Sequence, residues 1–428
     1  MKIKPNDRIV IIGGGFAGMK LVKALKNKPV RVTLLDKQNF HSFQPLLYQV
    51  ASARIEPASI SFPFRKAFHG YTNFDFRLST VERVDTVQKQ VVTDNGIVRY
   101  DHLVIATGCT SNFFGNEDLR KFALPMKEMS EAIKIRNRVL LDFEAYATAT
   151  TEEKEKLMNI LIVGAGATGV ELSGAFAELK NDVLTKDYPK VDFSGLDIIL
   201  LEGSSHTLAN MSDTSKRVSQ KYLEELGVRV KTNVFLKSYD GNKAVLSNGD
   251  VIPCKDLIWS AGVSGNIIHG VTPDENIVRN RYIVDRYNKV QGAENVYALG
   301  DVAYMETPKY PKGHPQVANV AINQALNLGK NFLNSLKERS LNEYEYKDLG
   351  MMATIGKNKA VVDLKHMKFQ GTMAWLVWMF LHLMLILSVR NKLIIFINWA
   401  WAYITKDTSL RLIITSKEND KKVSNGKD

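Results

Sequence analysis

Two stretches of the chain place three glycines at the spacing Gly-x-Gly-x-x-Gly. The two sets are Gly13, Gly15 and Gly18, and Gly164, Gly166 and Gly169. At this spacing the first glycine permits a tight turn and the second lets backbone N–H groups approach a pyrophosphate. The third lets a helix pack closely on the preceding strand. The chain therefore predicts two sites for the phosphates of dinucleotides.

An acidic residue follows each glycine pattern at the end of the next predicted strand. Asp36 closes a predicted strand over residues 30–36, and Glu202 closes one over residues 197–202. A carboxylate at this position accepts a hydrogen bond from a ribose hydroxyl. Two such folds in one chain imply two dinucleotides, and hence electron transfer between them.

Glu202 comes later than the usual interval of about 20 residues. Residues 181–196 are inserted before its strand, and because they contain Pro189 and Gly195 we expect a loop there. The carboxylate of Glu202 would repel a 2′-phosphate, and no Arg follows it in residues 203–206. NADH is therefore expected in preference to NADPH.

The elements that must position these residues alternate between strand and helix. Buried strands are expected just before Gly13 and over residues 30–36, 101–108, 159–163, 197–202 and 256–259, with helices over 16–25, 167–180 and 316–336, and an antiparallel meander over 80–100. This order predicts an α/β protein with two Rossmann-like, doubly wound, three-layer dinucleotide-binding domains.

Composition excludes several classes of protein. The 428 residues contain two cysteines, Cys109 and Cys254, so a disulfide framework and a paired-thiol flavin reductase are excluded. The eight histidines are scattered without a ligand pattern, so we expect no metal. Residues 1–7 are short and charged and do not resemble a signal peptide, which predicts cytoplasmic catalytic domains.

The positive charge is concentrated near the C-terminus. Of the net charge of +12, residues 357–428 carry +7, from twelve Lys or Arg and five Asp or Glu. Such asymmetry favours an anionic partner. The aromatic residues of this region lie inside apolar runs, which suits lipid and argues against nucleic acid.

Two apolar runs, residues 373–389 and 393–404, occupy this basic region. Three interpretations are open: a spanning helix, a buried core or dimer helix, and an interfacial anchor. A span needs about 20 apolar residues, whereas the first run has seventeen with His382 at its centre. Flanking Lys and Arg favour the anchor, which lies on an anionic membrane surface.

From residue 8 to about residue 411 the chain resembles the type II NADH dehydrogenases, a family of flavin-dependent NADH:quinone oxidoreductases with a disulfide-reductase-like fold. The matching cofactor-binding positions are Gly13, Gly14, Gly15, Phe16, Ala17, Gly18, Asp36, Lys37, Pro45, Leu46, Tyr48, Gln49, Ala106, Thr107, Gly108, Gly300, Asp301, Gln316 and Val317 toward FAD, and Gly164, Gly166, Ala167, Thr168, Gly169, Glu171, Glu202, Ala261 and Gly262 toward NADH. The family's quinone motif, Ala-Gln-x-Ala-x-Gln, is only partly kept. Gln316 and Ala318 match it, whereas Pro315 and Val320 do not.

The resemblance implies hydride transfer from NADH to FAD and two-electron reduction of a membrane quinone without proton pumping. Glu171 and Gln316 are then the candidate catalytic residues. Two alternatives are open. The Glu171 carboxylate would then only interact favourably with the helix dipole at the N-terminal end of its helix, and Gln316 would only cap a helix or contact FAD. For Tyr48 we expect aromatic packing at the flavin edge. A sulfide:quinone reductase and a non-enzymatic redox sensor remain alternative functions.

The resemblance also implies an organisation in four segments. Residues 1–118 and 285–342 form the FAD-binding domain, 119–284 the NADH-binding domain, and 343–428 a C-terminal membrane-association region. We expect a homodimer, bound peripherally to the cytoplasmic face of the cell membrane.

Overall fold

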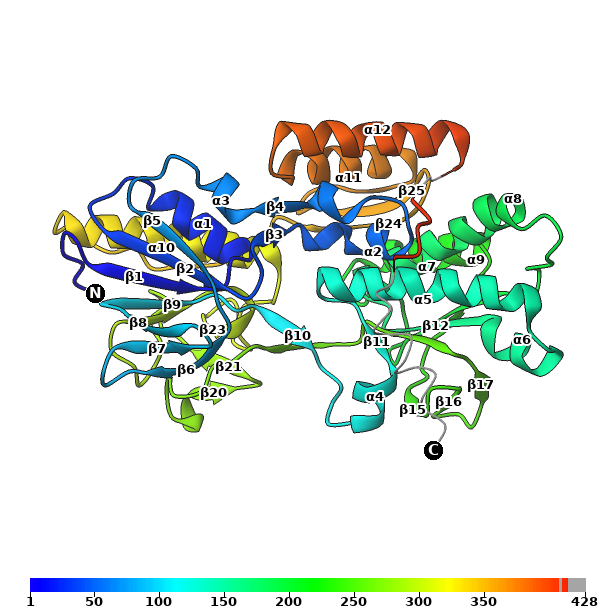
Figure 1. Cartoon of the computed structure of the whole chain (residues 1–428), viewed down its shortest axis with the longest axis horizontal. Coiled ribbons are helices and arrows are strands. Elements are labelled where there is room, and N and C mark those ends of the chain that lie inside the picture. The colour runs from blue at the N-terminus through cyan, green and yellow to red at the C-terminus, as the bar shows by residue number, and fades with distance from the viewer. Residues whose placement is uncertain (408–409, 415–428) are drawn as a thin grey trace. The chain divides into compact units, whose positions relative to one another are not determined.

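The computed structural model describes residues 1–407 and 410–414, and groups them into two compact units (Figure 1). The first unit contains Met1–Ser42, Ser61–Thr110 and Val263–Asp348. The second contains Phe43–Ile60, Ser111–Gly262 and the chain from Leu349 onward.

The core of the first unit is a parallel five-stranded sheet with the strand order β22-β9-β1-β2-β5. Its strands are β1 (Arg8–Ile12), β2 (Arg31–Asp36), β5 (Phe74–Leu78), β9 (His102–Ile105) and β22 (Val296–Ala298). Nearly continuous apolar sequence in β1 and β9 suits strands that are buried on both faces. The first glycine pattern therefore lies at the carboxyl end of a central strand.

Helices and smaller sheets complete the first unit. They are α1 (Phe16–Ala24), α3 (Phe64–Ala67) and α10 (Ala318–Leu336), the meander β6 (Val81–Asp85), β7 (Gln90–Thr93) and β8 (Gly96–Arg99), the pair β3 (Phe40–Ser42) and β4 (Ser61–Pro63), and the set β20 (Ile277–Val278), β21 (Arg281–Ile283) and β23 (Ala303–Tyr304). Because Gly329 has no side chain, α10 packs closely on α1 near Ala24. The predicted meander is confirmed.

The second unit repeats the central plan, with the strand order β11-β18-β12-β13-β14. Its sheet strands are β11 (Leu124–Pro125), β12 (Asn159–Val163), β13 (Asp197–Leu201), β14 (Val228–Lys231) and β18 (Asp256–Trp259), and its helices are α4 (Glu117–Phe122), α5 (Met129–Thr148), α6 (Thr151–Leu157), α7 (Ala167–Leu179) and α9 (Asp213–Glu225). A three-stranded antiparallel sheet is formed by β15 (Leu236–Tyr239), β16 (Lys243–Leu246) and β17 (Val251–Pro253).

The C-terminal part of the second unit is a small sheet followed by two helices. It contains β24 (Met351–Gly356), β25 (Lys359–Asp363), β26 (Lys368–Gln370), α11 (Thr372–Leu385) and α12 (Val389–Thr405). Helix α11 packs on β25, and α12 lies beside α11 (Figure 1). The helix α2 (Leu47–Ala51) belongs to the same unit and packs on α5 and α7.

Two expectations from the sequence were wrong in detail. The insertion at 181–196 does not begin as a loop, because α7 continues through a π-helical turn (Lys180–Leu184) and α8 (Thr185–Asp187). Val183 and Leu184 are buried there, which favours continued helix. The helix expected from residue 316 begins instead at Ala318. Arg390 and Lys392, which separate the two apolar runs, lie in the first turn of α12.

The limits of the two units also differ from the expected domain limits at 118 and 284. Tyr282 and Val284 are buried in the core of the first unit, together with Val271. The chain therefore returns to this unit at Val263. From Leu349 onward the C-terminal region groups with the second unit.

Gly174 provides a test of how α7 packs on β24. A Cβ atom at this position would lie 1.6 Å from the carbonyl oxygen of Ile355, which is backbone and cannot move away cheaply. We expect Gly174→Ala to destabilise the protein by about 1–3 kcal/mol through overpacking, measured as a lower melting temperature at a fixed scan rate. Gly195→Ala is the matched control, because its Cβ would meet only the flexible end of Met158. Equal melting temperatures would contradict this packing.

Candidate functional site

The first glycine turn leaves room for a ligand where a side chain would otherwise stand. Gly13 has φ +100°, and a Cβ there would lie 2.4 Å from the carbonyl oxygen of Ala106. A Cβ at Gly18 would lie 1.9 Å from the carbonyl oxygen of Gly13. At Gly15, in contrast, a Cβ would meet nothing within 4 Å. The turn is therefore closed on the protein side and open at Gly15.

The N-terminus of α1 faces this open side. Its N-cap is Gly15, and no side chain accepts a hydrogen bond from its first N–H groups. Such N–H groups and the positive end of the helix dipole bind anions. The Asp36 carboxylate holds the turn in place, since its Oδ2 accepts from the Gly14 N–H (2.6 Å) and its Oδ1 from the Gln38 N–H (2.8 Å).

The second glycine turn has the same construction in the second unit. Gly164 has φ +100°, and a Cβ at Gly169 would lie 1.9 Å from the carbonyl oxygen of Gly164. A Cβ atom at Gly166 would meet nothing within 4 Å. Gly166 is also the N-cap of α7, and no side chain accepts a hydrogen bond from the first N–H groups of this helix.

Glu202 occupies the position in the second unit that Asp36 occupies in the first. Its Oε2 accepts from the Ala165 N–H (2.7 Å), and its Oε1 accepts from the Ser204 N–H (2.8 Å). In both cases one oxygen holds the glycine turn and the other holds the residue two positions further on. The inserted residues therefore do not disturb the geometry at Glu202.

Three further predicted residues of the first unit lie together: Gly300, Asp301 and Gln316. The Gly300 N–H donates to Gln324 Oε1 (2.7 Å), and Gln316 Nε2 donates to the carbonyl oxygen of Asp301 (3.0 Å). The thiol of Cys109 donates to Asp301 Oδ2 (2.8 Å). Gln316 thus precedes α10 and braces the Asp301 loop. Gln324 is fully buried on α10, and its side-chain oxygen is occupied by the Gly300 N–H.

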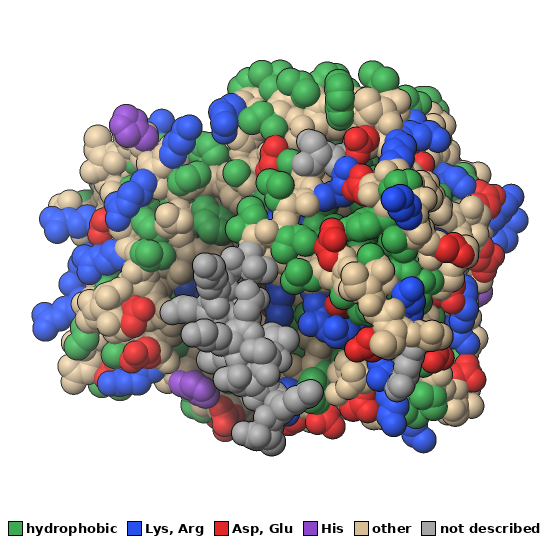
Figure 2. Space-filling view, turned by 45° about the vertical axis from the view of Figure 1, so that its right-hand side comes forward, with side chains coloured by type: hydrophobic (Ala, Val, Ile, Leu, Met, Phe, Trp, Pro, Cys, Tyr) green, Lys and Arg blue, Asp and Glu red, His purple; other side chains and the backbone are tan. Residues whose placement is uncertain are grey.

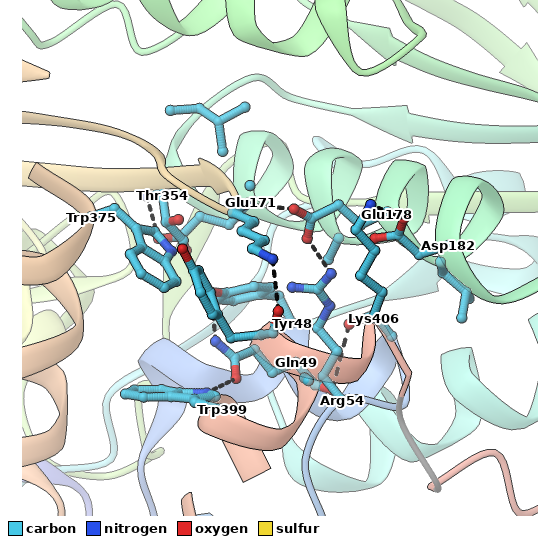
Figure 3. Close-up of a pocket in the computed structure, with 18 of the residues that line it drawn as sticks. Tyr48, Gln49, Arg54, Glu171, Glu178, Asp182, Thr354, Trp375, Trp399 and Lys406 are labelled. Carbon is cyan, nitrogen blue, oxygen red and sulfur yellow. Dashed lines mark hydrogen bonds and ion pairs between the residues drawn. The ribbon is translucent and has the colours of Figure 1, made fainter. Parts of the chain in front are cut away.

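A second group of predicted residues lines a pocket within the second unit (Figure 3). The cavity has a volume of about 90 Å³. Its walls come from α2, α7, β24, α11 and α12, through residues that include Tyr48, Gln49, Arg54, Glu171, Glu178, Thr354, Trp375, Trp378, Met379, Trp399 and Tyr403. Of these, only Tyr48, Gln49 and Glu171 were predicted as site residues.

The carboxyl group of Glu171 is buried in this pocket. Burial raises its pKa from 4.5 to about 8, although the backbone N–H of Thr354 (3.4 Å) and the side chain of Trp378 partly oppose this effect. A carboxyl group with such a pKa can hold and release a proton near neutral pH. Glu178, two helical turns further along α7, forms an ion pair with Arg54.

A chain of hydrogen bonds runs along another wall of the pocket (Figure 3). Trp399 Nε1 donates to Gln49 Oε1 (2.7 Å), and Gln49 Nε2 donates to the Tyr48 hydroxyl (2.8 Å). Tyr48 and Gln49 are both buried. The predicted cofactor positions at residues 45–49 therefore include two side chains that face the same pocket as Glu171.

Helices α11 and α12 present a large apolar surface on their other side. Figure 2 shows hydrophobic side chains gathered along the upper edge of the molecule, where Figure 1 places these helices. The exposed residues are Met373, Leu376, Phe380, Leu381, Met384, Leu385, Val389, Leu393, Phe396, Ile397, Trp401, Tyr403 and Ile404. We call this set the apolar face. In residues 1–407 and 410–414, no helix is long and apolar enough to cross a membrane.

Comparison with known proteins decides the family. The family model for pyridine nucleotide-disulphide oxidoreductases matches residues 7–325, and the model for the NDH2 C-terminal domain matches residues 349–406. Two type II NADH:quinone oxidoreductases of Mycobacterium tuberculosis are similar over nearly their whole length. NdhA is 30% identical, over 96% of this chain and 90% of its own, and Ndh is 31% identical, over 94% and 89%. This chain belongs to the type II NADH:quinone oxidoreductases.

Solved structures agree with this family in fold. NDH2 of Plasmodium falciparum in complex with NADH has a TM-score of 0.88 at 21% identity, covering 96% of this chain and all of its own. The sulfide:quinone oxidoreductase of Aquifex aeolicus has a TM-score of 0.70 at 19% identity, covering 94% and 98%. These structures show the α/β fold of the chain. The two mycobacterial relatives and the family models show that it is an FAD-dependent NADH:quinone reductase.

The two glycine turns fit the cofactors of a type II oxidoreductase. Each combines an open glycine position, an uncapped helix N-terminus and a strand-end carboxylate, which suits the pyrophosphate and ribose of a dinucleotide. The cysteines do not suit a sulfide:quinone reductase. Burial raises the pKa of the Cys254 thiol to about 12, and the Cys109 thiol donates to a carboxylate.

The tryptophans of the C-terminal region lie on two sides of α11 and α12. Trp375, Trp378 and Trp399 line the pocket, whereas Trp401 is well exposed. Periodicity over the two apolar runs was too weak to separate the inward from the outward positions. Arg54 and Thr354 had no sequence signal, because the fold alone brings them to α7.

The two open glycine positions give a reciprocal test of cofactor assignment. A Cβ atom at Gly15 or Gly166 would meet no protein atom within 4 Å, so we expect a valine side chain there to fill the space for a pyrophosphate. We expect Gly15→Val to fold but to purify without flavin, seen as lost visible absorbance. Gly166→Val should stay yellow while NADH binding weakens at least tenfold, measured by titration. A yellow Gly15→Val protein would show that the first turn is misassigned.

Proposed function

We propose that the first unit binds FAD, that the second binds NADH, and that the quinone reacts at the pocket lined by Glu171. The observation that carries this proposal is a buried carboxyl group, that of Glu171, in a pocket whose walls include α11 and α12; burial raises the pKa of this group to about 8. The same two helices bear the apolar face, which would give a lipid-soluble substrate a short route from a membrane.

FAD, when bound, accepts a hydride from NADH and passes two electrons to the quinone. The overall reaction consumes NADH, one proton and a quinone, and yields NAD⁺ and a quinol. The protein must therefore supply or conduct a proton to a quinone oxygen. Glu171 holds a proton at neutral pH and stands in the proposed pocket, so it is our candidate for this step.

The cofactor roles of the predicted residues are part of the same proposal. Asp36 and Glu202 would accept from the two riboses, and Asp301 would hold the flavin's side chain. Gln316 Nε2 donates a hydrogen bond to the carbonyl oxygen of Asp301, which supports a role in positioning FAD. This role would stand beside that of quinone donor, which the motif predicts.

We further propose that the apolar face seats the enzyme on an anionic membrane. Lys365, Lys368, Arg390, Lys392 and Lys406 flank the two helices. Buried apolar area and attraction to anionic lipid act together in such anchors. The cytoplasmic face and a homodimer complete the proposal and rest on the family resemblance.

Replacing Glu171 tests its role as a proton source. Its carboxyl is protonated below pH 8 and charged above it, so quinone-dependent flavin reoxidation should slow as pH rises through about 8. Glu171→Gln should reoxidise more slowly, at least several-fold at pH 7, and lose this pH dependence. Reduction of the flavin by NADH, followed by stopped flow, should change little.

Glu171→Gln should also change how the thermal stability of the protein depends on pH. A carboxyl whose pKa is raised on folding makes the native protein lose stability as pH rises from about 4.5 to about 8. Glu171→Gln should therefore raise the melting temperature most above pH 8. Glu294→Gln, at an exposed turn position in the first unit, serves as the control. Unchanged reoxidation and stability profiles would contradict the assignment.

The membrane proposal is tested by making the apolar face polar. Phe380 and Phe396 are 61% and 54% exposed, so Phe380→Gln/Phe396→Gln leaves the interior intact. We expect this variant to keep its flavin and its NADH-to-dye activity but to lose most sedimentation with anionic liposomes. Wild-type binding should weaken with added salt. Substitution is preferable to truncation after Met367, which would uncover the buried Val362 and Ala360.

Val87→Gln/Ile97→Gln is the matched control, because both residues are exposed apolar positions in the first unit. It should sediment with liposomes like the wild type. If the α11–α12 variant also sediments normally, the apolar face is not the membrane contact.

A further inference from the structure

The hydrogen-bond chain from Trp399 to Tyr48 has a fixed direction. An indole N–H can only donate a hydrogen bond, so the atom of Gln49 that faces Trp399 at 2.7 Å must be the amide oxygen. The amide nitrogen then faces the Tyr48 hydroxyl at 2.8 Å, and an NH₂ group can only donate. The Tyr48 oxygen is therefore the acceptor of this bond.

The Tyr48 proton is consequently free to point elsewhere. Gln49 is the only hydrogen-bond partner of the Tyr48 hydroxyl in the described part of the chain. Burial, and to a lesser degree the nearby Glu171, raise the pKa of Tyr48 well above 10, so the phenol stays protonated. A buried O–H without an acceptor costs free energy, which a ligand with an acceptor oxygen would recover.

We propose that Tyr48 donates a hydrogen bond to a carbonyl oxygen of the quinone, and that Trp399 is the positioning residue that enforces this direction through Gln49. The inference rests on the proposed function, since it places the quinone in this pocket. It assigns to Tyr48 a contact with substrate in place of the aromatic packing expected from the sequence.

The position of Trp399 links this chain of hydrogen bonds to the proposed membrane contact. Trp399 lies on α12, whose neighbouring Trp401 is 61% exposed on the apolar face. The residue that sets the direction of the Tyr48 bond thus belongs to the helix proposed to rest on the membrane. The helix that would contact the membrane, α12, would therefore also set the orientation of the Tyr48 hydroxyl that donates to the quinone.

The fixed direction of the hydrogen bonds from Trp399 to Tyr48 predicts an unusual pattern among variants. Trp399→Phe removes the indole N–H, so the Gln49 amide can turn and accept from Tyr48, which withdraws the phenol proton from the pocket. Gln49→Met has no acceptor oxygen, so it leaves Tyr48 free to donate. Adding Gln49→Met should therefore suppress the defect of Trp399→Phe.

The measurements are quinone-dependent flavin reoxidation by stopped flow and calorimetric binding of a short-chain benzoquinone to the oxidised holoenzyme. We expect Tyr48→Phe and Trp399→Phe each to slow reoxidation and weaken binding about two- to tenfold, the range for one lost hydrogen bond. Trp399→Phe/Gln49→Met should bind quinone and reoxidise like Gln49→Met alone, and faster than Trp399→Phe, because Trp399 has no amide left to orient. Trp401→Phe, on the same helix, is the matched control and should match the wild type.

Flavin content and reduction by NADH are measured for every variant, so a misfolded protein is recognised. If Trp399→Phe does not fold, Tyr48→Phe still decides the question, because wild-type binding and reoxidation in it would overturn the proposal. A double variant slower than Trp399→Phe would also overturn it, since additive losses indicate packing. If Tyr48→Phe and Glu171→Gln both reoxidise at the wild-type rate, the pocket is not the quinone site. If Glu171→Gln reoxidises slowly and Tyr48→Phe does not, the pocket stands as the quinone site and only the Tyr48 proposal fails.

Discussion

The hydrogen bond from a glycine turn to the carboxylate at the end of the next strand is the interaction on which both halves of the molecule depend. Asp36 makes it to Gly14 and Glu202 makes it to Ala165, with nearly equal lengths of 2.6 and 2.7 Å. The bond ties the start of a helix to the neighbouring parallel strand. It also leaves the helix N-terminus uncapped, so its N–H groups remain available to a pyrophosphate.

In the second unit the same helix serves two sites. Helix α7 begins at the glycine turn and carries Glu171 and Glu178, which are seven residues apart and so lie on one side of the helix. Both line the pocket. Gly174, between them, allows the backbone of β24 to approach and to bring Thr354 to Glu171. The dinucleotide fold thereby provides one wall of a pocket whose other walls come from α2 and the C-terminal region.

The sequence predicted the parts of this architecture that follow from local rules. Glycine spacing, apolar strands and strand-end acids are short-range signals, and they located both turns, even with an insertion before Glu202. The pocket is different, because Arg54, Thr354 and Trp399 come from segments far apart in the chain. Continuous apolar sequence in α11 and α12 hid the alternation between residues that face the pocket and residues that face outward. The helix expected at Gln316 begins two residues later, because Val317 is extended and serves as its N-cap.

The central claim is that the quinone reacts in the pocket of the second unit, and photolabelling with an azido-quinone tests it most directly. The oxidised holoenzyme is irradiated with the probe, digested and analysed by mass spectrometry, with excess unlabelled quinone as competitor. If the quinone reacts in this pocket, competable adducts should form on α2 and on the pocket side of α11, near Tyr48 and Trp378. Competable adducts confined to the segment around Gln316, with the pocket unlabelled, would contradict it.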